Sequence, residues 1–340
     1  MIKKPQKLTI KDIARLANVS PTAVSFVLNG KVGVSTATRE KVHAVIAATN
    51  YKPNPSSLRL SYRKSFNIAL VYPPSASPFA DLYYYEIARG LTDKLSAAGY
   101  NVVFAKMQSS GKDHNLPRIL ASNDADGIIL LQDMDPASLS RIESLDIPFV
   151  MVDIHKPDLV HTHVSVDSEK SINAVVQYLI NQGHTKIAFL GSDWLPGYYL
   201  QCLAGYQSAL ATNGLPIQAG WLQKSANSQV ETAACISRLL KCVERPTAIC
   251  CMGDAYAIDA IKFIKESGLS VPKDISIISI DDILLSQYID PPLTTVRYDK
   301  EEMGQIAARL LLDKMAGKPV ESVIVNSECI VERQSVRALR

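Results

Sequence analysis

Apolar side chains recur at three- and four-residue intervals in the first fifty residues, which is the spacing of short amphipathic helices. The pattern predicts a first helix at Ile10–Ala17, with a capping-box-like start at Thr9, and a second at Pro21–Asn29 after a short turn. A third helix is expected to start after Ser35. Two short helices joined by a tight turn are typical of a helix-turn-helix, so this segment is a candidate DNA-binding head.

From Phe66 onward the pattern changes to apolar, strand-like runs that alternate with amphipathic helical stretches. Strands are expected at Asn67–Tyr72, Asn101–Ala105, Gly127–Leu131, Pro148–Asp153, Lys186–Gly191, Thr247–Met252 and Ser276–Asp281. Helices are expected at Glu86–Ala97, Glu169–Asn181, Gln201–Thr212, Thr232–Cys242 and Ala255–Ser267. Continuous apolar strands separated by helices are typical of parallel sheets buried on both faces. The predicted fold is therefore an all-α helix-turn-helix head joined to an α/β body of two doubly wound, parallel-sheet subdomains.

The segment between head and body, Tyr51–Ser65, has two prolines, several basic residues and little core pattern. It is interpreted as a linker with room for one short helix. The expected domains are the head at 1–50, the linker or hinge helix at 51–65 and the body at 66–340. Within the body, the first subdomain is expected at about 66–160 and 291–320, and the second at about 161–290 and 321–340.

Charge is distributed unevenly along a chain whose net charge is only +3. Residues 1–65 hold twelve Lys and Arg against two acidic residues, so this segment carries +10 and the rest of the chain −7. A basic head on an acidic body favours a polyanion such as DNA as the partner of the head. A solvated basic arm would have the same composition.

Composition and motifs exclude several other classes of protein. Apolar residues make up 47% of the chain, as in globular proteins, and no apolar run reaches the ~18 residues of a membrane span. The N-terminal residues lack the pattern of a signal peptide, and the six Cys include no CxxC pair, so we expect core thiols in a reducing cytoplasm and no metal site. The motifs GxSxG, GxGxxG, HExxH and the P-loop are absent, which predicts a protein that is not an enzyme and needs no cofactor.

The second predicted helix has one apolar face and one mostly polar face. The apolar face carries Ala23, Val24, Val27 and Leu28. The other face is free to meet a groove of DNA and carries Pro21, Thr22, Ser25, Phe26 and Asn29. Phe26 is open to two interpretations, which are packing at the border of the head core and contact with a thymine methyl or a base edge.

The head segment TIKDIARLANVSPTAVSFVLNG, followed by VSTATREKVHAVIAATNYKPN, closely resembles the DNA-binding head of the LacI/GalR family of bacterial repressors. Blocks of the body are similar to the same family, including DADGIILL, VSVDSEKS, LINQGHTKIAFLG, VPKDISIISIDD and the ending VERQSV. The resemblance covers nearly the whole chain. It implies a periplasmic-binding-protein-like body that binds a small effector, and a homodimer whose heads read a two-fold symmetric operator. Because the family's C-terminal heptad tail is absent, we expect a dimer rather than a tetramer.

Carried over by position, the resemblance places Thr22 and Phe26 where the family reads bases, with Pro21 beside them. The DNA contacts that it implies are Thr9, Ser20, Pro21, Thr22, Ser25, Phe26, Asn29, Asn54 and Leu60. Leu60 matches the hinge-helix leucine that wedges into the minor groove and bends the duplex; from the sequence alone it is equally a chance apolar residue in a loop. The family most often has Arg where this chain has Phe26, and Arg reads guanine whereas Phe offers apolar contact. The operator is therefore expected to differ from those of better-known relatives.

Carboxylates follow several of the predicted strands, and ligands of doubly wound folds bind at the carboxyl ends of strands. Such carboxylates suit the hydroxyls of a sugar or polyol, but an Asp at a strand end can instead cap the helix that follows. Asp254 precedes a predicted helix and fits a cap, whereas Asp153 and Asp281 precede none.

The resemblance places Asp281 on the effector-binding aspartate of the family. It also places Tyr83 and Tyr84 on an aromatic segment that offers either a stacking surface or helix packing. The predicted effector contacts are Ser75, Asp81, Tyr83, Tyr84, Asp153, Tyr199, Gln201, Asn227, Asp254 and Asp281.

One departure from the family concerns the effector, because the arginine that often grips it is Leu200 here. Its loss argues against a phosphorylated or carboxylate effector and weakens the case for a standard hexose. It also leaves open a family member controlled mainly by a protein partner. A solute-binding protein without a DNA role shares the body fold and is the other alternative, although it would need export. The sequence thus predicts a cytoplasmic repressor whose affinity for operator DNA is controlled by a small molecule, with a carbohydrate as the expected class.

Overall fold

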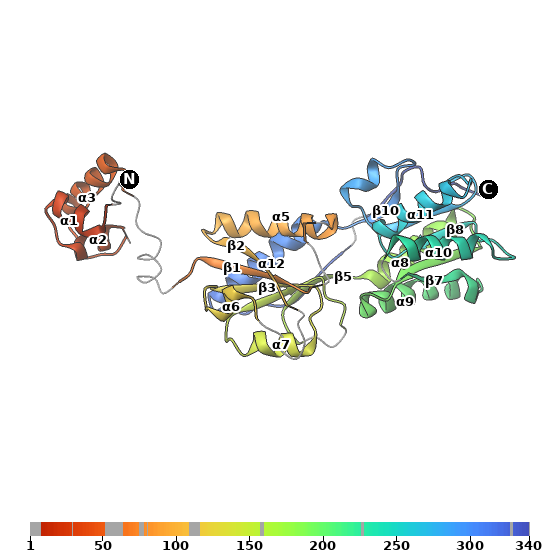
Figure 1. Cartoon of the computed structure of the whole chain (residues 1–340), viewed down its shortest axis with the longest axis horizontal. Helices are drawn as coiled ribbons and strands as arrows, with labels where there is room; N and C mark the ends of the chain where they lie inside the picture. Colours follow the sequence, from red (N-terminus) through yellow and green to blue (C-terminus); the bar gives the residue numbers. More distant parts are fainter. Residues whose placement is uncertain are drawn as a thin grey trace, which may run out of the picture. The chain divides into compact units, whose positions relative to one another are not determined.

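The structure is a computed structural model that describes residues 8–28, 30–51, 64–74, 78–79, 81–108, 116–156, 160–225, 228–326 and 329–339. It divides into two compact units, Met1–Phe66 and Asn67–Arg340. These units contain the head and the body of the sequence prediction (Figure 1).

The described part of the head contains three helices, α1 at Ile10–Ala17, α2 at Pro21–Leu28 and α3 at Thr36–Thr49 (Figure 1). At the start of α1 the Thr9 hydroxyl accepts from the Asp12 N–H, while the Asp12 carboxylate accepts from the Thr9 N–H. This is the predicted capping box. Ile13, Val24 and Val42 contribute one fully buried side chain from each helix. The helix-turn-helix head predicted from the apolar spacing is thus confirmed.

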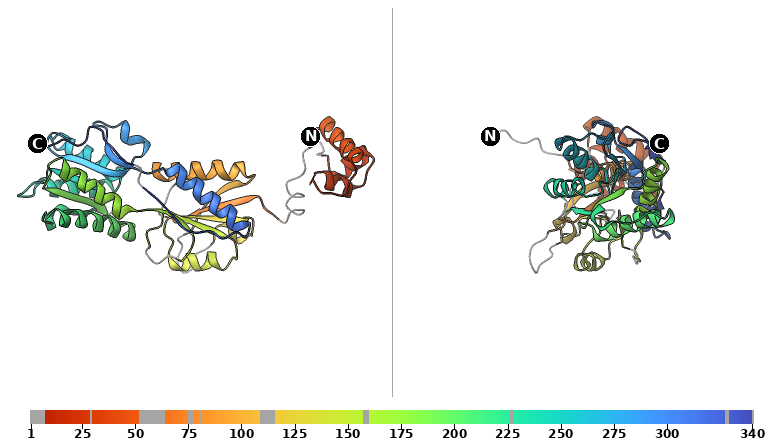
Figure 2. Two further views of the ribbon diagram at one scale, coloured as in Figure 1. Left: turned by 180° about the vertical axis from the view of Figure 1, so that it is seen from behind. Right: turned by 90° about the vertical axis from the view of Figure 1, so that its right-hand side faces the viewer.

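The body contains two sheets of six described strands each (Figures 1 and 2). The first has the order β11-β5-β4-β3-β1-β2, with β1 at Asn67–Tyr72, β2 at Asn101–Lys106, β3 at Gly127–Leu131, β4 at Phe149–Val152, β5 at His163–Val166 and β11 at Val323–Val325. The second has the order β12-β10-β9-β8-β6-β7, with β6 at Ile187–Ser192, β7 at Leu222–Ser225, β8 at Ala248–Cys251, β9 at Ser276–Asp281, β10 at Thr294–Arg297 and β12 at Cys329–Val331. The neighbouring strands run parallel, except that β12 pairs antiparallel with β10.

Helices cover both faces of each sheet, which is the doubly wound arrangement. On the first sheet, α5 (Leu82–Ala97) and α12 (Lys300–Met315) pack side by side on one face, with α6 (Arg118–Ala121) and α7 (Pro136–Glu143) on the other. On the second sheet, one face carries α8 (Ser168–Asn181) and α9 (Pro196–Thr212), and the other carries α10 (Gln229–Leu240) and α11 (Asp254–Glu266). The predicted pair of doubly wound subdomains is confirmed. No helix in the described ranges is long and apolar enough to span a membrane.

Glycines set the close approach of α5 and α12. A Cβ atom on Gly90 would lie 2.0 Å from the Glu301 carbonyl oxygen, and one on Gly304 would lie 2.1 Å from the Ile87 carbonyl oxygen. A larger residue at either position would therefore force the two helices apart.

The boundaries between the two subdomains lie elsewhere than predicted. Within the described ranges the chain crosses between the sheets from β5 to α8, from β10 to α12 and from β11 to β12. The prediction placed these crossings near 160, 290 and 320. The correction has a simple cause, because β5 and β11 pair with each other at the edge of the first sheet, whereas β10 pairs with β9 in the second.

Candidate functional site

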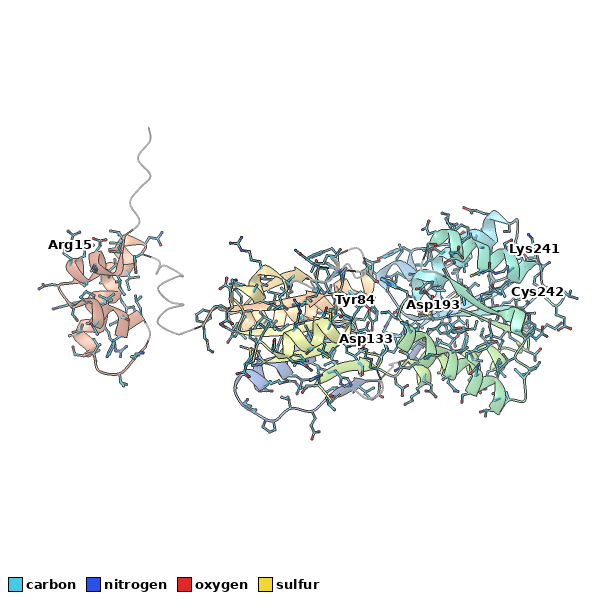
Figure 3. The ribbon with its side chains drawn as sticks, turned by 60° about the horizontal axis from the view of Figure 1, so that its bottom comes forward. Arg15, Tyr84, Asp133, Asp193, Lys241 and Cys242 are labelled. Carbon is cyan, nitrogen blue, oxygen red and sulfur yellow. The ribbon has the colours of Figure 1, made fainter. Side chains whose placement is uncertain are left out.

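A cavity of about 120 Å³ lies between the two subdomains of the body, at the carboxyl ends of strands from both sheets. From the first subdomain it is lined by Asp81, Tyr83, Tyr84, Gln132, Asp153 and His155. From the second it is lined by Trp194, Leu195, Tyr198, Met252, Gly253, Ala255, Tyr256, Asp281 and Ile283. Figure 3 shows Tyr84 on the first-subdomain side of this junction and Asp193, next to the lining Trp194, on the other.

Asp153 is the centre of a buried hydrogen-bond network on the first-subdomain wall. Its Oδ2 accepts the Tyr84 hydroxyl at 2.6 Å, and its Oδ1 accepts the Tyr83 hydroxyl at 3.2 Å. The His155 Nε2 lies 3.3 Å from the same Oδ1. Burial acts to raise the pKa of the Asp153 carboxyl, but the His155 charge and these hydrogen bonds outweigh it, so the pKa is lowered.

The imidazole of His155 lies between two acceptors. Its Nδ1 is 3.3 Å from Gln201 Oε1, while Gln201 Nε2 donates to the His155 carbonyl at 3.3 Å, which fixes the orientation of the amide. Both ring nitrogens therefore face an oxygen, an arrangement that favours the doubly protonated imidazolium. Burial acts to lower the pKa of His155, but Asp153 outweighs it and raises the pKa. The charge of His155 is thus neutralised by Asp153 inside the wall.

Two further carboxylates face the cavity from opposite subdomains. Asp81 is the N-cap of α5, and its Oδ1 accepts from the Tyr83 N–H at 2.9 Å. Asp281 ends β9 with a positive φ of 118°, and its Oδ2 lies 3.4 Å from the Asp254 amide nitrogen. Burial raises the pKa of both carboxyls, and a second negative charge adds to the effect, Asp153 near Asp81 and Asp254 near Asp281.

In the head, the face of α2 predicted to meet DNA is the face that the core leaves uncovered. Val24 and Val27 are buried, whereas Pro21 and Thr22 are exposed and Ser25 is half-buried. A short helix with one exposed, mostly polar face next to a tight turn is the arrangement that enters a major groove.

Phe26 is half-buried on the same helix. Its ring lies 3.5 Å from the position that a Cβ atom of Gly33 would occupy, and the Lys31 ammonium is 5.9 Å from the ring centre. The ring therefore packs on the loop after α2 while part of it stays accessible, and both interpretations of Phe26 remain open.

Two of the predicted DNA-contact residues also hold the helices of the head. The Thr9 hydroxyl caps α1 through Asp12, and the Ser20 hydroxyl accepts from the Ala23 N–H of α2 at 3.1 Å. The predicted contacts Asn29, Asn54 and Leu60 lie outside the described residues.

Known proteins share both the head and the body of this chain. Residues 9–54 match the model of bacterial regulatory proteins of the lacI family, and residues 176–336 match a periplasmic binding protein-like domain. HTH-type transcriptional repressor PurR of Aliivibrio salmonicida is 31% identical over 336 residues, which cover 97% of this chain and 99% of that repressor. The chain belongs to the LacI family.

Further LacI-family proteins match at similar length. The ribose operon repressor of Haemophilus influenzae is 30% identical to this chain, and the match covers 98% of this chain and 99% of that repressor. The Lac repressor dimer bound to operator and an anti-inducer is 26% identical, with a TM-score of 0.85 and coverage of 98% of this chain and 100% of that chain. The complex of the regulator CelR with cellobiose is 27% identical, with a TM-score of 0.71 and coverage of 97% and 100%.

Family membership decides between the functions that the sequence left open. The protein is a DNA-binding transcriptional repressor that is controlled by a small-molecule effector, and it is not an enzyme. The match over residues 9–54 excludes a solute-binding protein without a DNA role.

Asp254 has neither of the two roles predicted for it, which were effector contact and helix capping. It does not line the cavity, and it does not cap α11, because it is the first residue of that helix and Gly253 is the N-cap. Its fully buried carboxylate accepts from Ser279, Ser286, Thr295 and the Ile283 N–H. Asp254 therefore ties β9, β10 and the segment after Asp281 together.

Two other predicted effector residues do not line the cavity. Gln201 stands behind the wall and orients His155. Tyr199 packs on Phe189, with the Lys224 ammonium 4.9 Å from its ring centre. Ser75 and Asn227 lie outside the described residues. The structure thus brings together Asp81, Tyr83, Tyr84, Asp153 and Asp281 from the predicted set.

The sequence prediction missed several lining residues, above all Gln132, His155 and Tyr256. Gln132 directly follows β3 and has a positive φ of 69°, so its place after an apolar strand was an available signal. His155 follows β4 by a few residues, but no spacing in the sequence links it to its partner Gln201.

Proposed function

We propose that two copies of this repressor form a dimer and place α2 of each head in the major groove of a two-fold symmetric operator. The exposed face of α2 with Pro21 and Thr22, together with the +10 charge of residues 1–65, supports this arrangement. One head makes too few base contacts to discriminate among genomic sites, and two half-sites roughly multiply the discrimination. We propose Ser25, Phe26 and Asn29 as further groove contacts, with Thr9, Ser20, Asn54 and Leu60 at the flanks.

The effector proposed for the cavity is a single-ring, polyhydroxylated compound of the sugar class. The observation that carries this proposal is a cavity of about 120 Å³ with carboxylates on opposite walls and aromatic rings between them. Carboxylates accept hydroxyl hydrogen bonds strongly, and aromatic faces suit the apolar faces of a sugar ring. An engineered cavity of about 150 Å³ holds one benzene molecule, so this cavity is of single-ring size. The ribose operon repressor and the CelR–cellobiose complex are relatives whose names point to sugars, although cellobiose has two rings.

A phosphorylated or carboxylated sugar fits the cavity poorly. Among the described lining residues there is no Lys or Arg, and the imidazolium of His155 is already paired with Asp153. Leu200, at the position where the family often has Arg, is exposed. An anionic ligand would therefore face buried carboxylates without a matching cation.

A thermal-shift screen of the full-length protein against pentoses and hexoses, in neutral and amino forms, tests the proposed class. A ligand present at about 100 times its Kd adds roughly 2.7 kcal/mol to stability. For a body of this size that is a rise in Tm of about 5–10 °C. The proposal fails if no monosaccharide of either form raises the Tm.

A further inference from the structure

Three tyrosine hydroxyls on the cavity wall already donate within the protein. The Tyr83 and Tyr84 hydroxyls donate to Asp153, and the Tyr198 hydroxyl donates to the Met252 carbonyl. These groups present few free donors to an incoming ligand.

Acceptors, in contrast, are available. Gln132 is 1% exposed and lines the cavity; its amide bonds to Tyr84, but its Oε1 has no hydrogen-bond partner among the described residues. Asp81 and Asp281 add two carboxylates on opposite walls. A buried acceptor without a donor costs about 1–3 kcal/mol, so the wall is built for a ligand rich in donors.

The described lining of the cavity also has more acidic side chains than basic ones. Within the described lining, three carboxylates face one cation, and that cation, His155, is paired with Asp153. Lys300 lies near Asp281 but is not one of the residues that line the cavity. Its ammonium donates to the backbone carbonyls of Asp281 and Asp282 and lies 3.5 Å from the Glu86 carboxylate. Asp81 and Asp281 therefore face the cavity as two acidic groups with no cationic side chain beside them in the described lining.

We propose that the effector is an amino sugar, which brings a protonated amine to Asp81, Asp281 and Gln132. This inference rests on the proposed sugar class and narrows it. An ammonium group has three donors and no acceptor, so it matches the unpaired Gln132 Oε1 and the two carboxyl groups better than a hydroxyl does. The aromatic residues Trp194 and Tyr256 line the same cavity, and aromatic rings attract cations.

The acid–base behaviour of the wall agrees with this assignment. Burial and a neighbouring negative charge raise the pKa of Asp81 and Asp281 in the empty protein. A bound cation would relieve that repulsion and stabilise the ionised carboxylates, whereas an anion would increase it. Cation binding should thus release protons from the two carboxyls.

The test compares each amino sugar with two uncharged relatives, one that has a hydroxyl in place of the amine and one whose amine is acetylated. D-Glucosamine, D-galactosamine and D-mannosamine are each measured beside the neutral parent hexose and the N-acetyl form, by thermal shift and calorimetry on the full-length protein. We expect at least one amine to bind about ten-fold or more tightly than both uncharged counterparts, because hydrogen bonds to charged groups are worth 1.5–3 kcal/mol. The parent hexose keeps the size of the amine and removes the charge, whereas the N-acetyl form keeps an N–H donor but adds bulk, so the comparison with the parent hexose decides.

Two variants place the charge discrimination at the cavity. Asp281→Asn and Asp81→Asn should each reduce the preference for the amine over the neutral hexose to about three-fold or less. Asp193→Asn removes an exposed carboxylate beside the cavity that pairs with Lys224, and it should leave the preference unchanged. Because the readout is a ratio of two affinities in one variant, a general loss of stability does not imitate it.

The outcomes separate this inference from the proposed function. If neutral hexoses bind as tightly as the amines, or if Asp281→Asn keeps the full preference, the amino-sugar assignment is overturned and the sugar class stands. If neither the amines nor the neutral sugars bind, both are overturned.

Discussion

Replacing Asp254 by alanine tests how much its buried carboxylate stabilises the body. The Asp254 carboxylate accepts four hydrogen bonds, with Oδ1 facing the hydroxyls of Ser279 and Thr295, and Oδ2 facing the Ser286 hydroxyl and the Ile283 N–H. Truncation removes all four acceptors at once. The hydroxyls can turn toward other partners, but the Ile283 N–H is fixed in the backbone and stays unpaired.

The size of the effect follows from these bonds. Hydrogen bonds to a charged group contribute about 1.5–3 kcal/mol each, and the cost of burying the carboxylate, several kcal/mol, offsets much of their sum. We expect Asp254→Ala to lower the free energy of unfolding by about 3–5 kcal/mol. Asp254→Asn should cost less, about 1–2 kcal/mol, because two hydroxyls can rotate to accept from an amide nitrogen while the remaining oxygen keeps the Ile283 N–H.

Urea denaturation of the full-length protein, followed by circular dichroism, measures these differences. The urea concentration at the midpoint should be highest for the wild type, lower for Asp254→Asn and lowest for Asp254→Ala. The slope of the unfolding free energy against urea concentration should be the same for all three. Asp259→Ala is the matched control, because Asp259 lies on the same helix, is only half-buried and accepts a hydrogen bond from Gln229. The reasoning is refuted if Asp254→Ala costs no more stability than Asp259→Ala.

Three further changes have defined outcomes. Phe26→Arg should shift the base preferred in each half-site toward guanine by about 1–3 kcal/mol in binding-site selection; an unchanged consensus would place Phe26 inside the head core. Asp281→Asn should raise the Tm of the ligand-free protein at neutral pH. The pKa of Asp281 in the folded protein lies above its ordinary value of 3.8, so the stability of the wild type falls as the pH rises from 3.8 through that raised pKa. The gain in Tm of Asp281→Asn over the wild type should therefore shrink toward acidic pH. A gain in Tm that is the same at every pH would contradict the raised pKa. Gly90→Ala should destabilise the body by about 1–3 kcal/mol in urea denaturation, since its Cβ atom meets the Glu301 carbonyl; an unchanged midpoint would show that the helices can separate without cost.

Elements with long apolar runs were predictable from sequence. The bounds of β1 and β9, Asn67–Tyr72 and Ser276–Asp281, equal the predicted ones, because buried parallel strands require an unbroken apolar stretch. Helix α12 is absent from the prediction although it has 16 residues. Gly304 in its middle weakens the helical signal, and the reason for that glycine, contact with Ile87 on α5, is visible only in the fold.

Residues of the candidate site were predictable where their position at the end of a strand is enough to place them in the cavity. Asp153 and Asp281 reach the cavity because they stand at the carboxyl ends of β4 and β9. Asp254 could not be assigned in the same way, since its side chain turns toward Ser279 and Thr295, which lie 25 and 41 residues further along the chain. The orientation of the His155 ring likewise depends on Gln201, a partner 46 residues away.

Anisotropy titration of a fluorescent operator, chosen by selection from random DNA, tests most directly whether the cavity controls the head. The full-length protein is titrated without and with each amino sugar that raises its Tm, beside the Asp281→Asn variant. We expect such a sugar to change operator affinity by about five-fold or more in the wild type, and to leave it unchanged in the variant. Identical binding curves with and without a sugar that demonstrably occupies the cavity would contradict the account.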